Sequence, residues 1–463
     1  MSSSCQSRSY IALILHSAVI LLCGIMLGSC AAGIHSPRVA KSLDEALITR
    51  DLDAALAIVE NPKYYKAKER LLYYLDAGVL YHYKGDWAKS NELLDLAEDA
   101  IVELYTKSVA RAGASMLIND NMLEYSGEDY EDVYINVFKA LNYLKLGDTE
   151  AAFVEIRKVD DKLSYLEQKY AQIAKEMSKN EEAKIEIKAG KNRFHSSALA
   201  RYLSMTLYDA AQQKDDARID YDNILFAFRS QPEIYPFSPP DIIHPQTAKA
   251  GNVVRVLSFV NRGPYKKARE LHIHTSEDML LIGSVDDDVL LDAIPWKGIK
   301  EGYYFKFAVP YLQQRQARIA FVEAVTQDGK RYRLQKLEDL NQVAVQSYEI
   351  KEPLILLKSV TRTVLKGLAA EEAKAQAEKR SSSLAASLIS LATDATVYFS
   401  ESADLRLSQF FPQAALIAEI PLPEGEHKIR LEYFSQQGNM LYAEEHPIRV
   451  SRNKPNLISS WCF

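Results

Sequence analysis

The chain has 463 residues, of which 48% are hydrophobic and 25% are charged, an ordinary composition for a globular protein. This length exceeds what one hydrophobic core usually organises, so two or three domains are expected. The formal net charge of -6 excludes the strongly basic surface that nucleic-acid binding usually needs, and no nucleic-acid partner is expected.

Residues 1–29 are predicted to be a targeting segment. Arg8 gives a short positive region, and the run from Ile11 to Leu27 is almost wholly apolar, as in a secretory signal peptide. The stretch that closes this run resembles the lipobox of bacterial lipoproteins; it consists of Leu27, Gly28, Ser29 and Cys30. The resemblance implies that Cys30 is acylated and becomes the mature N-terminus, and that the processing enzymes read the three residues before it. An ordinary signal peptide or an uncleaved anchor is the alternative.

Lipidation of Cys30 predicts a protein that stays on a membrane, because several acyl chains on one cysteine exceed the marginal binding of a single chain. Ala31 follows the cysteine, where the Asp associated with inner-membrane retention is absent, so the resemblance implies the outer membrane, facing the periplasm. No other run approaches 18 apolar residues, and the rest of the chain is expected to be soluble. Cys462 alone remains after processing, so no intrachain disulfide is expected.

Helical periodicity and tight turns mark the first half of the mature chain. Residues 133–163 carry apolar residues at helical spacing on both sides of Gly147-Asp148, which predicts two antiparallel amphipathic helices. Similar turns occur at three other places: Arg50-Asp51, Gly85-Asp86 and Gln212 to Asp216. The first interval, from 50 to 85, is 35 residues; the next two, from 85 to 147 and from 147 to 212, are 62 and 65. Each longer interval can hold two degenerate units or one unit with an elongated helix.

The residues around these turns resemble the tetratricopeptide repeat (TPR), which places small, aromatic and glycine residues at fixed offsets. In two units they are Gly78, Tyr81, Gly85 and Trp87, and then Ala140, Tyr143, Gly147 and Ala152. The resemblance implies a solenoid over residues 30–230 with a concave surface that binds a peptide or protein. The alternative is that the helices only support the C-terminal half. Residues 160–192, rich in Lys, Glu, Gln and Ala, are expected to form a long exposed helix that projects past the solenoid.

The character of the sequence changes at residue 231. Five prolines fall within 232–245, which predicts an extended linker over 231–250 or a strap across a domain surface. Residues 251–463 are predicted to form an α+β domain with antiparallel, sandwich-like strands and a helical insertion at 337–393. The expected strands are Val253 to Val260, Phe305 to Val309, Arg318 to Thr326, Tyr332 to Leu334, Ala415 to Ile420, Lys428 to Phe434 and Ile448 to Val450. The expected fold class is thus multidomain, a helical TPR-like solenoid followed by an α+β domain.

The sequence contains no convincing catalytic constellation, metal site or cofactor motif. His272 and His274 would share one face of a strand, as in some metal sites, but no third ligand lies at a recognisable spacing. The three aspartates at 286–288 lack the alternation and the glycine of a calcium loop. Asp404 and Arg406, two apart on an expected strand, are interpreted as a structural ion pair in preference to a ligand site.

Several segments of the chain are distinctive in combination. They are Tyr130 to Val133, Ala140 to Leu144 with Gly147-Asp148, Val253 to Gly263, Asp404-x-Arg406, and Leu422 to Gly425. Together they resemble a family of uncharacterised bacterial lipoproteins that join a TPR-like N-terminal half to an α+β C-terminal half, and the resemblance covers most of the mature chain. That family usually has a tryptophan shortly after the Asp-x-Arg pair, where this chain has residues 407–411. Membership implies no known reaction.

The function expected from these observations is that of a lipid-anchored protein of the bacterial cell envelope. It would bind an envelope protein through its TPR-like surface, as a non-enzymatic scaffold without a cofactor. The alternative is an envelope hydrolase or glycan-active enzyme whose site lies in the C-terminal half, near His272, His274 or Asp404. The identity of the partner and the oligomeric state stay open.

Overall fold

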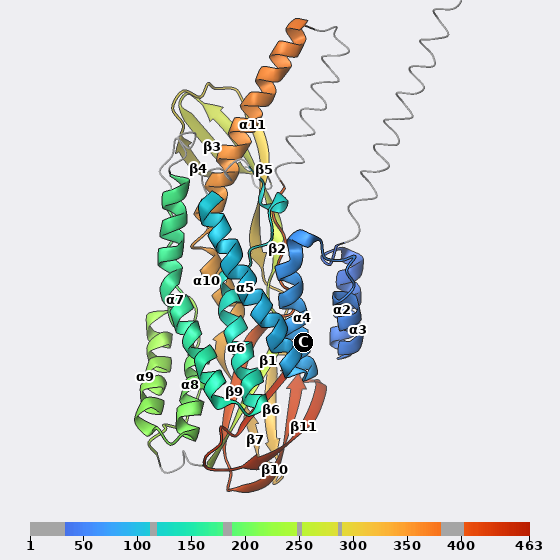
Figure 1. Ribbon diagram of the computed structural model, residues 1–463, viewed down its shortest axis with the longest axis vertical. Coiled ribbons are helices and arrows are strands. Elements are labelled where there is room, and N and C mark those ends of the chain that lie inside the picture. The colour runs from blue at the N-terminus through green and yellow to red at the C-terminus, as the bar shows by residue number, and fades with distance from the viewer. Residues whose placement is uncertain (1–32, 112–117, 179–187, 248–251, 286–288, 381–401) are drawn as a thin grey trace, which may run out of the picture.

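The computed structural model describes residues 33–111, 118–178, 188–247, 252–285, 289–380 and 402–463. The predicted lipidation motif, Leu27 to Cys30, and the aspartates at 286–288 lie outside the described residues. Figure 1 shows an elongated molecule in which a helical region, residues 37–230, is followed by a β-rich region, and the chain is therefore a mixed α+β, multidomain protein. Among the described residues, no helix is both long enough and apolar enough to cross a membrane.

The helical region consists of consecutive helices in four pairs. Their bounds are α2 Pro37–Ile48 and α3 Leu52–Val59, α4 Arg70–Lys84 and α5 Trp87–Arg111, α6 Asp129–Leu146 and α7 Thr149–Met177, and α8 Ala198–Ala210 and α9 Lys214–Ser230. The helices of each pair contact each other and are joined by only two or three residues, so each pair is an antiparallel hairpin.

The turn inside each pair places one residue in the left-handed backbone region. These residues are Arg50, Gly85, Gly147 and Gln212, with φ of 58°, 87°, 83° and 63°. Glycine adopts this conformation without a steric penalty, so Gly85 and Gly147 can end α4 and α6 without strain. Asp148 then caps α7 by accepting the backbone N–H of Ala151 at 2.9 Å, and Asp51 caps α3 in the same way. The four turns expected from the sequence are confirmed.

Elongated helices fill the two long intervals between turns. α5 has 25 residues and α7 has 29, so in the described residues each interval fits one unit with an elongated helix and not two short units. The expectation of an exposed helix over 160–192 is wrong for its described part, because α7 ends at Met177 and buries Tyr170 and Met177 against Ile350 and Leu354. Its charged residues occupy one side of the helix, while apolar residues at helical spacing occupy the other.

The β-rich region forms three four-stranded sheets. The strands are β1 Val253–Arg262, β2 Tyr265–Ser276, β3 Met279–Ser284, β4 Leu290–Pro295, β5 Tyr304–Gln313, β6 Phe321–Thr326, β7 Arg331–Arg333, β8 Gln335–Asp339, β9 Pro412–Pro421, β10 Gly425–Phe434, β11 Met440–Val450 and β12 Leu457–Cys462. The first sheet has the order β12-β1-β9-β8, the second β11-β10-β6-β7 and the third β4-β3-β2-β5. Paired strands are antiparallel except β1 and β12, which run parallel.

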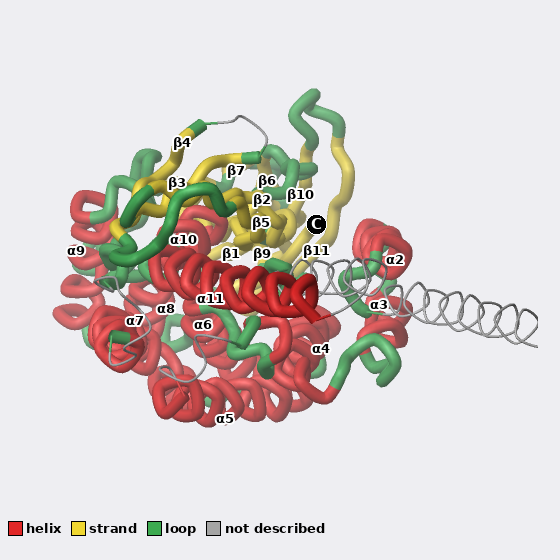
Figure 2. The backbone as a smooth tube through the Cα atoms, turned by 90° about the horizontal axis from the view of Figure 1, so that it is seen from above, coloured by secondary structure: helices red, strands yellow, loops and turns green. Residues whose placement is uncertain are grey.

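The first sheet lies between the helices and the second sheet. Along β1, Val254 and Val256 belong to the core shared with the second sheet, whereas Leu257 and Phe259 belong to the core shared with the helices. Because both faces of β1 are covered, its sequence is an almost continuous apolar run and not an alternating one. Figure 2 shows helices α4 to α9 in an arc along one side of the strands.

The inner face of this arc is covered by the chain's own β region. Tyr83 of α4 contacts Trp461 of β12 with ring centroids 4.9 Å apart, and Phe138 of α6 stacks on Phe259 of β1 at 5.3 Å. Tyr202 of α8 donates a hydrogen bond of 3.1 Å to Glu419 of β9. We call this contact surface, formed by α4, α6 and α8 with the first sheet, the seam. The surface that a solenoid would offer to a partner is therefore occupied, on this face, by the first sheet.

The proline-rich segment is a strap that packs on both regions. Tyr235 is buried and donates a hydrogen bond of 2.7 Å to Glu338 of β8, and the backbone N–H of Ile243 donates one of 2.6 Å to Glu419. Prolines prevent this segment from forming a helix, and its hydrogen bonds go instead to side chains of the first sheet. The strap alternative for residues 231–247 therefore fits better than a free linker.

The helical insertion consists of α10 Leu340–Tyr348 and α11 Glu352–Arg380. The expected start at Leu337 is wrong, because residues 335–339 pair with β9 as strand β8 and Asp339 caps α10 by accepting the N–H of Gln342. One face of the third sheet packs on α11, where Val360 and Val364 join the core. The sequence analysis did not anticipate β3, β4 or β12. Only β12 has a distant partner, β1, whereas β3 and β4 pair with the strands directly before them in the chain.

Candidate functional site

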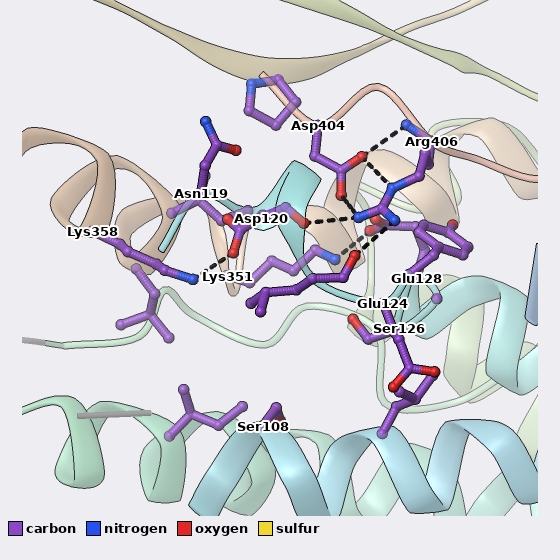
Figure 3. Close-up of a pocket in the computed structure, with 18 of the residues that line it drawn as sticks. Ser108, Asn119, Asp120, Glu124, Ser126, Glu128, Lys351, Lys358, Asp404 and Arg406 are labelled. Carbon is purple, nitrogen blue, oxygen red and sulfur yellow. Dashed lines mark hydrogen bonds and ion pairs between the residues drawn. The ribbon is translucent and has the colours of Figure 1, made fainter. Parts of the chain in front are cut away.

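A pocket of about 280 Å³ lies where the helical region, the third sheet and α11 meet (Figure 3). Its walls come from α5, the connector 118–128, the C-terminal part of α7, β2, β5, the start of α11 and the segment 402–406. Seven cationic and four acidic side chains line it: Lys107, Lys169, Lys266, Lys351, Lys358, Arg362 and Arg406, with Asp120, Glu124, Glu128 and Asp404. Its volume is at the lower end of the range for small-ligand pockets.

Glu128 is shared by two lysines from different elements. It is the N-cap residue of α6, and Lys266 of β2 approaches its Oε1 at 2.5 Å while Lys351, just before α11, pairs with its Oε2. The side chains of Glu128 and Lys266 are each only 5% exposed. Burial lowers the pKa of Lys351, but Glu128 and Asp129 raise it more, and the net shift is upward. One carboxylate thus contacts the amino groups of two lysines.

A second ion pair continues this cluster along α7. Lys169 contacts Asp129 Oδ1 at 2.7 Å, and the Tyr170 hydroxyl donates a hydrogen bond of 2.6 Å to Asp129 Oδ2. Burial raises the pKa of Asp129, but Lys169 and Lys351 lower it further, so the net shift is downward. The carboxylate is therefore held in its ionised form by its neighbours.

Asp404 and Arg406 form the opposite wall of the pocket. Arg406 makes a bidentate contact with Asp404, with Nε–Oδ1 at 2.9 Å and Nη2–Oδ2 at 2.7 Å. The guanidinium also donates to the backbone carbonyls of Leu123 at 3.0 Å and Asp120 at 2.9 Å, as Figure 3 shows in part. Burial raises the pKa of Asp404, but the bond to Arg406 and the charge of Lys266 reverse the shift to a net lowering. The two residues lie outside any strand, which corrects the strand placement expected from the sequence.

The rest of the lining combines rim ion pairs with an apolar wall. Lys358 of α11 pairs with Asp120, and Lys107 of α5 contacts Glu124 at 3.3 Å. The apolar lining includes Ile101, Leu104, Ile173, Met177, Leu354 and Ile355. Three tyrosines, Tyr125, Tyr170 and Tyr348, lie beside the central lysines, and burial, the main cause, raises the pKa of each. The pocket therefore offers cations beside an apolar surface.

Of the residues suspected from the sequence, only Asp404 and Arg406 line this pocket. His272 and His274 lie together on the third sheet, with ring centroids 5.0 Å apart, and neither lines the pocket. His272 lies directly over Gly283, where any Cβ would sit 2.4 Å from its Nε2. In the described parts of the chain, no three His, Cys, Asp or Glu residues gather in a way that could hold a metal ion.

The residues of the TPR-like pattern pack inside and between the helix pairs. A Cβ on Gly78 would lie 2.8 Å from Leu94 Cδ2, so glycine permits the close approach of α4 and α5, and Ser90 donates a hydrogen bond of 2.8 Å to the Gly78 carbonyl. Ala140 and Ala152 are fully buried. Three aromatic residues of the pattern are only partly buried: Tyr81, Trp87 and Tyr143.

Comparisons with protein-family models, with curated proteins and with solved structures give no match. The sequence analysis missed the lysines of the pocket, which come from four distant segments, around residues 107, 169, 266 and 351–358. No local spacing relates these positions, so only the fold brings them together. The Tyr-Glu-Asp-Val stretch at 130–133 was noticed, but Glu128 and Asp129 beside it were not.

Proposed function

We propose that this chain is a lipid-anchored protein of the bacterial cell envelope that binds an envelope protein and does not transform it. The anchor is Cys30, placed by its lipobox-like motif in an outer-membrane lipoprotein that faces the periplasm. The resemblance to lipoproteins with a TPR-like first half and an α+β second half supports this proposal. The oligomeric state is not part of it.

We propose that the helix pairs are TPR-like and that the sheets are sandwich-like. The equivalent left-handed turns and the close contact of α4 with α5 at Gly78 support the first assignment. The core shared by the first and second sheets supports the second. In this arrangement the seam holds the two regions together, and the array does not present its inner face to a partner.

The observation that carries the binding proposal is the pocket, to which the helical region, the third sheet, α11 and the 402–406 segment all contribute side chains. It replaces the covered inner face as the place where a partner is recognised. Its four carboxylates, at Asp120, Glu124, Glu128 and Asp404, each contact a lysine or arginine. Carboxylates that are paired with cations in this way suit recognition of charge better than proton transfer.

The hydrolase alternative receives less support. It would need His272, His274 or Asp404 to meet in one cleft, and only Asp404 lines the pocket. The two histidines lie on β2, on a part of the third sheet that does not face the pocket.

Photocrosslinking in intact cells tests the binding proposal. A photoreactive residue at Ser108, which lines the pocket, is expected to capture an envelope protein in one defined adduct. The matched control is the same residue at Glu150, an exposed position in the first turn of α7 that is not part of the pocket. Capture of the same protein with equal yield at both positions, or at neither, would reject the pocket as the recognition site.

Replacement of Cys30 tests the anchor. Cys30→Ala is expected to release the protein from membranes or to block its processing, because the acylated thiol is removed. Metabolic labelling with a fatty acid, followed by membrane fractionation, measures the effect, and Cys462→Ala is the control that keeps the motif. A Cys30→Ala variant that still incorporates the label would contradict the lipoprotein assignment.

A further inference from the structure

We infer that the pocket captures the free C-terminus of its protein partner, with the terminal carboxylate at the lysine cluster and an apolar last side chain against the adjoining wall. This inference rests on the proposed function and names the chemistry of the same site. Three features of the pocket carry it: its excess of positive charge, its small volume and the apolar surface beside the charges.

The excess of positive charge selects an anion. Seven cationic side chains line the pocket against four acidic ones; Lys169 and Lys107 also pair with Asp129 and Glu103 just outside the lining, and Glu128 alone serves both Lys266 and Lys351. An ammonium group has three N–H donors, so two lysines on one carboxylate retain donors for a second acceptor. The carboxylate of a ligand would complete this cluster through charge-assisted hydrogen bonds.

The position of the lysines strengthens the preference of the pocket for an anion. Lys351 directly precedes α11, and its backbone carbonyl accepts the N–H of Ile355, so the pocket lies at the positive end of the helix. Lys358 lies two turns further along α11 and also lines the pocket. An amino terminus or a lysine side chain would be repelled here, whereas a carboxylate would be attracted.

The volume of the pocket restricts what part of a protein can enter. A segment in the middle of a chain must both enter and leave, and a helix is about 10 Å wide with its side chains. A pocket of about 280 Å³ suits a single chain end instead. Of the two chain ends, only the C-terminus carries a negative charge at neutral pH.

The apolar lining specifies the last side chain. Ile173 and Met177 of α7 pack with Leu354 of α11 in one apolar cluster along the side of the pocket, and Ile355 of α11 also lines it. A terminal aliphatic or aromatic side chain would bury its surface there while its carboxylate reaches the lysines. An acidic or amide side chain on the last residue of the partner would not gain the free energy of burying an apolar surface there.

Fluorescence anisotropy with the full-length protein in a maltoside detergent tests the inference. The probe is a labelled hexapeptide, Gly-Ser-Gly-Ser-Leu-Phe, with a free C-terminal carboxylate, and the matched probe is the same peptide as its C-terminal amide. The free acid is expected to bind at least about tenfold more tightly, since a charge-assisted hydrogen bond contributes that much or more. Equal affinity of the two peptides would overturn the inference.

Two lysine variants separate the pocket from the general charge of the protein. Lys351→Gln is expected to weaken binding of the free acid at least about fivefold and to leave the amide unchanged. Lys162→Gln is the matched control: its side chain is 19% exposed against 15% for Lys351, it also pairs with a carboxylate, and it does not line the pocket. Equal weakening by both variants would reject the site. If Lys351→Gln is unfolded by circular dichroism, Lys358→Gln takes its place with the same expected outcome.

Removal of the Glu128 carboxylate, which competes with the ligand for the two lysines, is expected to strengthen binding. Glu128→Gln keeps an acceptor for the start of α6 but takes the negative charge away from Lys266 and Lys351, so the free-acid peptide is expected to bind more tightly, by about threefold or more. If the role of Glu128 is purely structural, Glu128→Gln lowers the melting temperature without tightening binding, and that result would count against the inference.

Octyl phosphate tests the other class of anion. If it binds more tightly than the peptide, the pocket serves a lipid-like ligand and the assignment to a C-terminus is wrong.

The two proposals fail in different ways. If Ser108 captures a protein in cells but the acid and amide peptides bind alike, the pocket recognises its partner by other chemistry. If the peptides discriminate but no protein is captured at Ser108, the site binds carboxylates and the protein-binding function is rejected.

Discussion

Carboxylates are held in two ways in this molecule, by neutral donors around Glu338 at the seam and by cations in the pocket; Glu419 of the seam also contacts a cation, Arg255, at 3.2 Å. At the seam, Glu338 accepts hydrogen bonds from Tyr134, Tyr235, Ser197 and the backbone N–H of Leu199, all of which are neutral donors. In the pocket, Glu128, Asp404 and Asp120 contact lysine or arginine. Neutral donors satisfy the hydrogen-bonding capacity of a buried carboxylate and hold its side chain in one position. Cations in addition produce an electrostatic potential that can attract a charged ligand.

The pKa shifts follow the same division. Burial raises the pKa of Asp76 and of Glu131 to about 7, and raises that of Glu338, although hydrogen bonds oppose the change. In and beside the pocket, the lysines and Arg406 lower the pKa of Asp404 and Asp129 despite burial. The carboxylates that accept bonds from neutral donors thus have raised pKa values, whereas Asp129 and Asp404, which contact cations, have lowered ones.

The largest effect is expected at the centre of the seam. Glu338→Ala leaves the hydroxyls of Tyr134 and Tyr235 and the N–H of Leu199 without their acceptor, and is expected to lower the free energy of unfolding by about 4 kcal/mol. Chemical denaturation measures this loss in the free energy of unfolding. Glu338→Gln, which keeps one acceptor oxygen, should lose clearly less, and a loss below about 1 kcal/mol for the alanine variant would show that the seam does not depend on this residue.

A pH titration of stability sharpens the contrast. Burial raises the pKa of Glu131 in the folded state from its ordinary value of 4.5 to about 7, so between these values the folded state binds a proton that the unfolded state has lost. Its contribution to stability is therefore present at low pH and is lost as the pH rises from about 4.5 through 7, by about 3 kcal/mol at most. Unfolding free energies at pH 5 and pH 7.5 measure this loss. Glu131→Gln should show a smaller decrease over this window; an unchanged pH slope would contradict a raised pKa at this site.

The smallest of the three effects is expected in the pocket. Asp404→Asn removes the partner of a largely buried guanidinium, which keeps its two backbone carbonyl acceptors, so the loss in the free energy of unfolding should be about 2 kcal/mol. Arg218→Ala, which breaks a pair on the exposed side of α9, is the control and should cost less than about 0.5 kcal/mol. Equal losses for the two variants would mean that the Asp404–Arg406 pair behaves as a surface contact.

Several local structures followed from short stretches of sequence. Gly85, Gly147 and the aspartates after them predicted helix ends and starts, because left-handed backbone and side-chain capping depend on one or two residues. The strand at 253–262 was equally clear from its continuous apolar run. The Asp404–Arg406 pair was anticipated as well, since the two residues are only two positions apart in the chain.

The tertiary structure decided what these elements cover and where charges meet. α6 is buried on nearly all sides because the first sheet packs on the face that a free solenoid would expose. Residue 337 lies in a strand because its neighbours Lys336 and Glu338 pair with Leu416 and Ala415 of β9, about 80 residues away. The lysines of the pocket belong to segments that no periodicity connects. The sequence by itself determined features set by neighbouring residues, whereas burial, sheet pairing and the pocket depend on contacts between distant segments, which only the complete fold brings together.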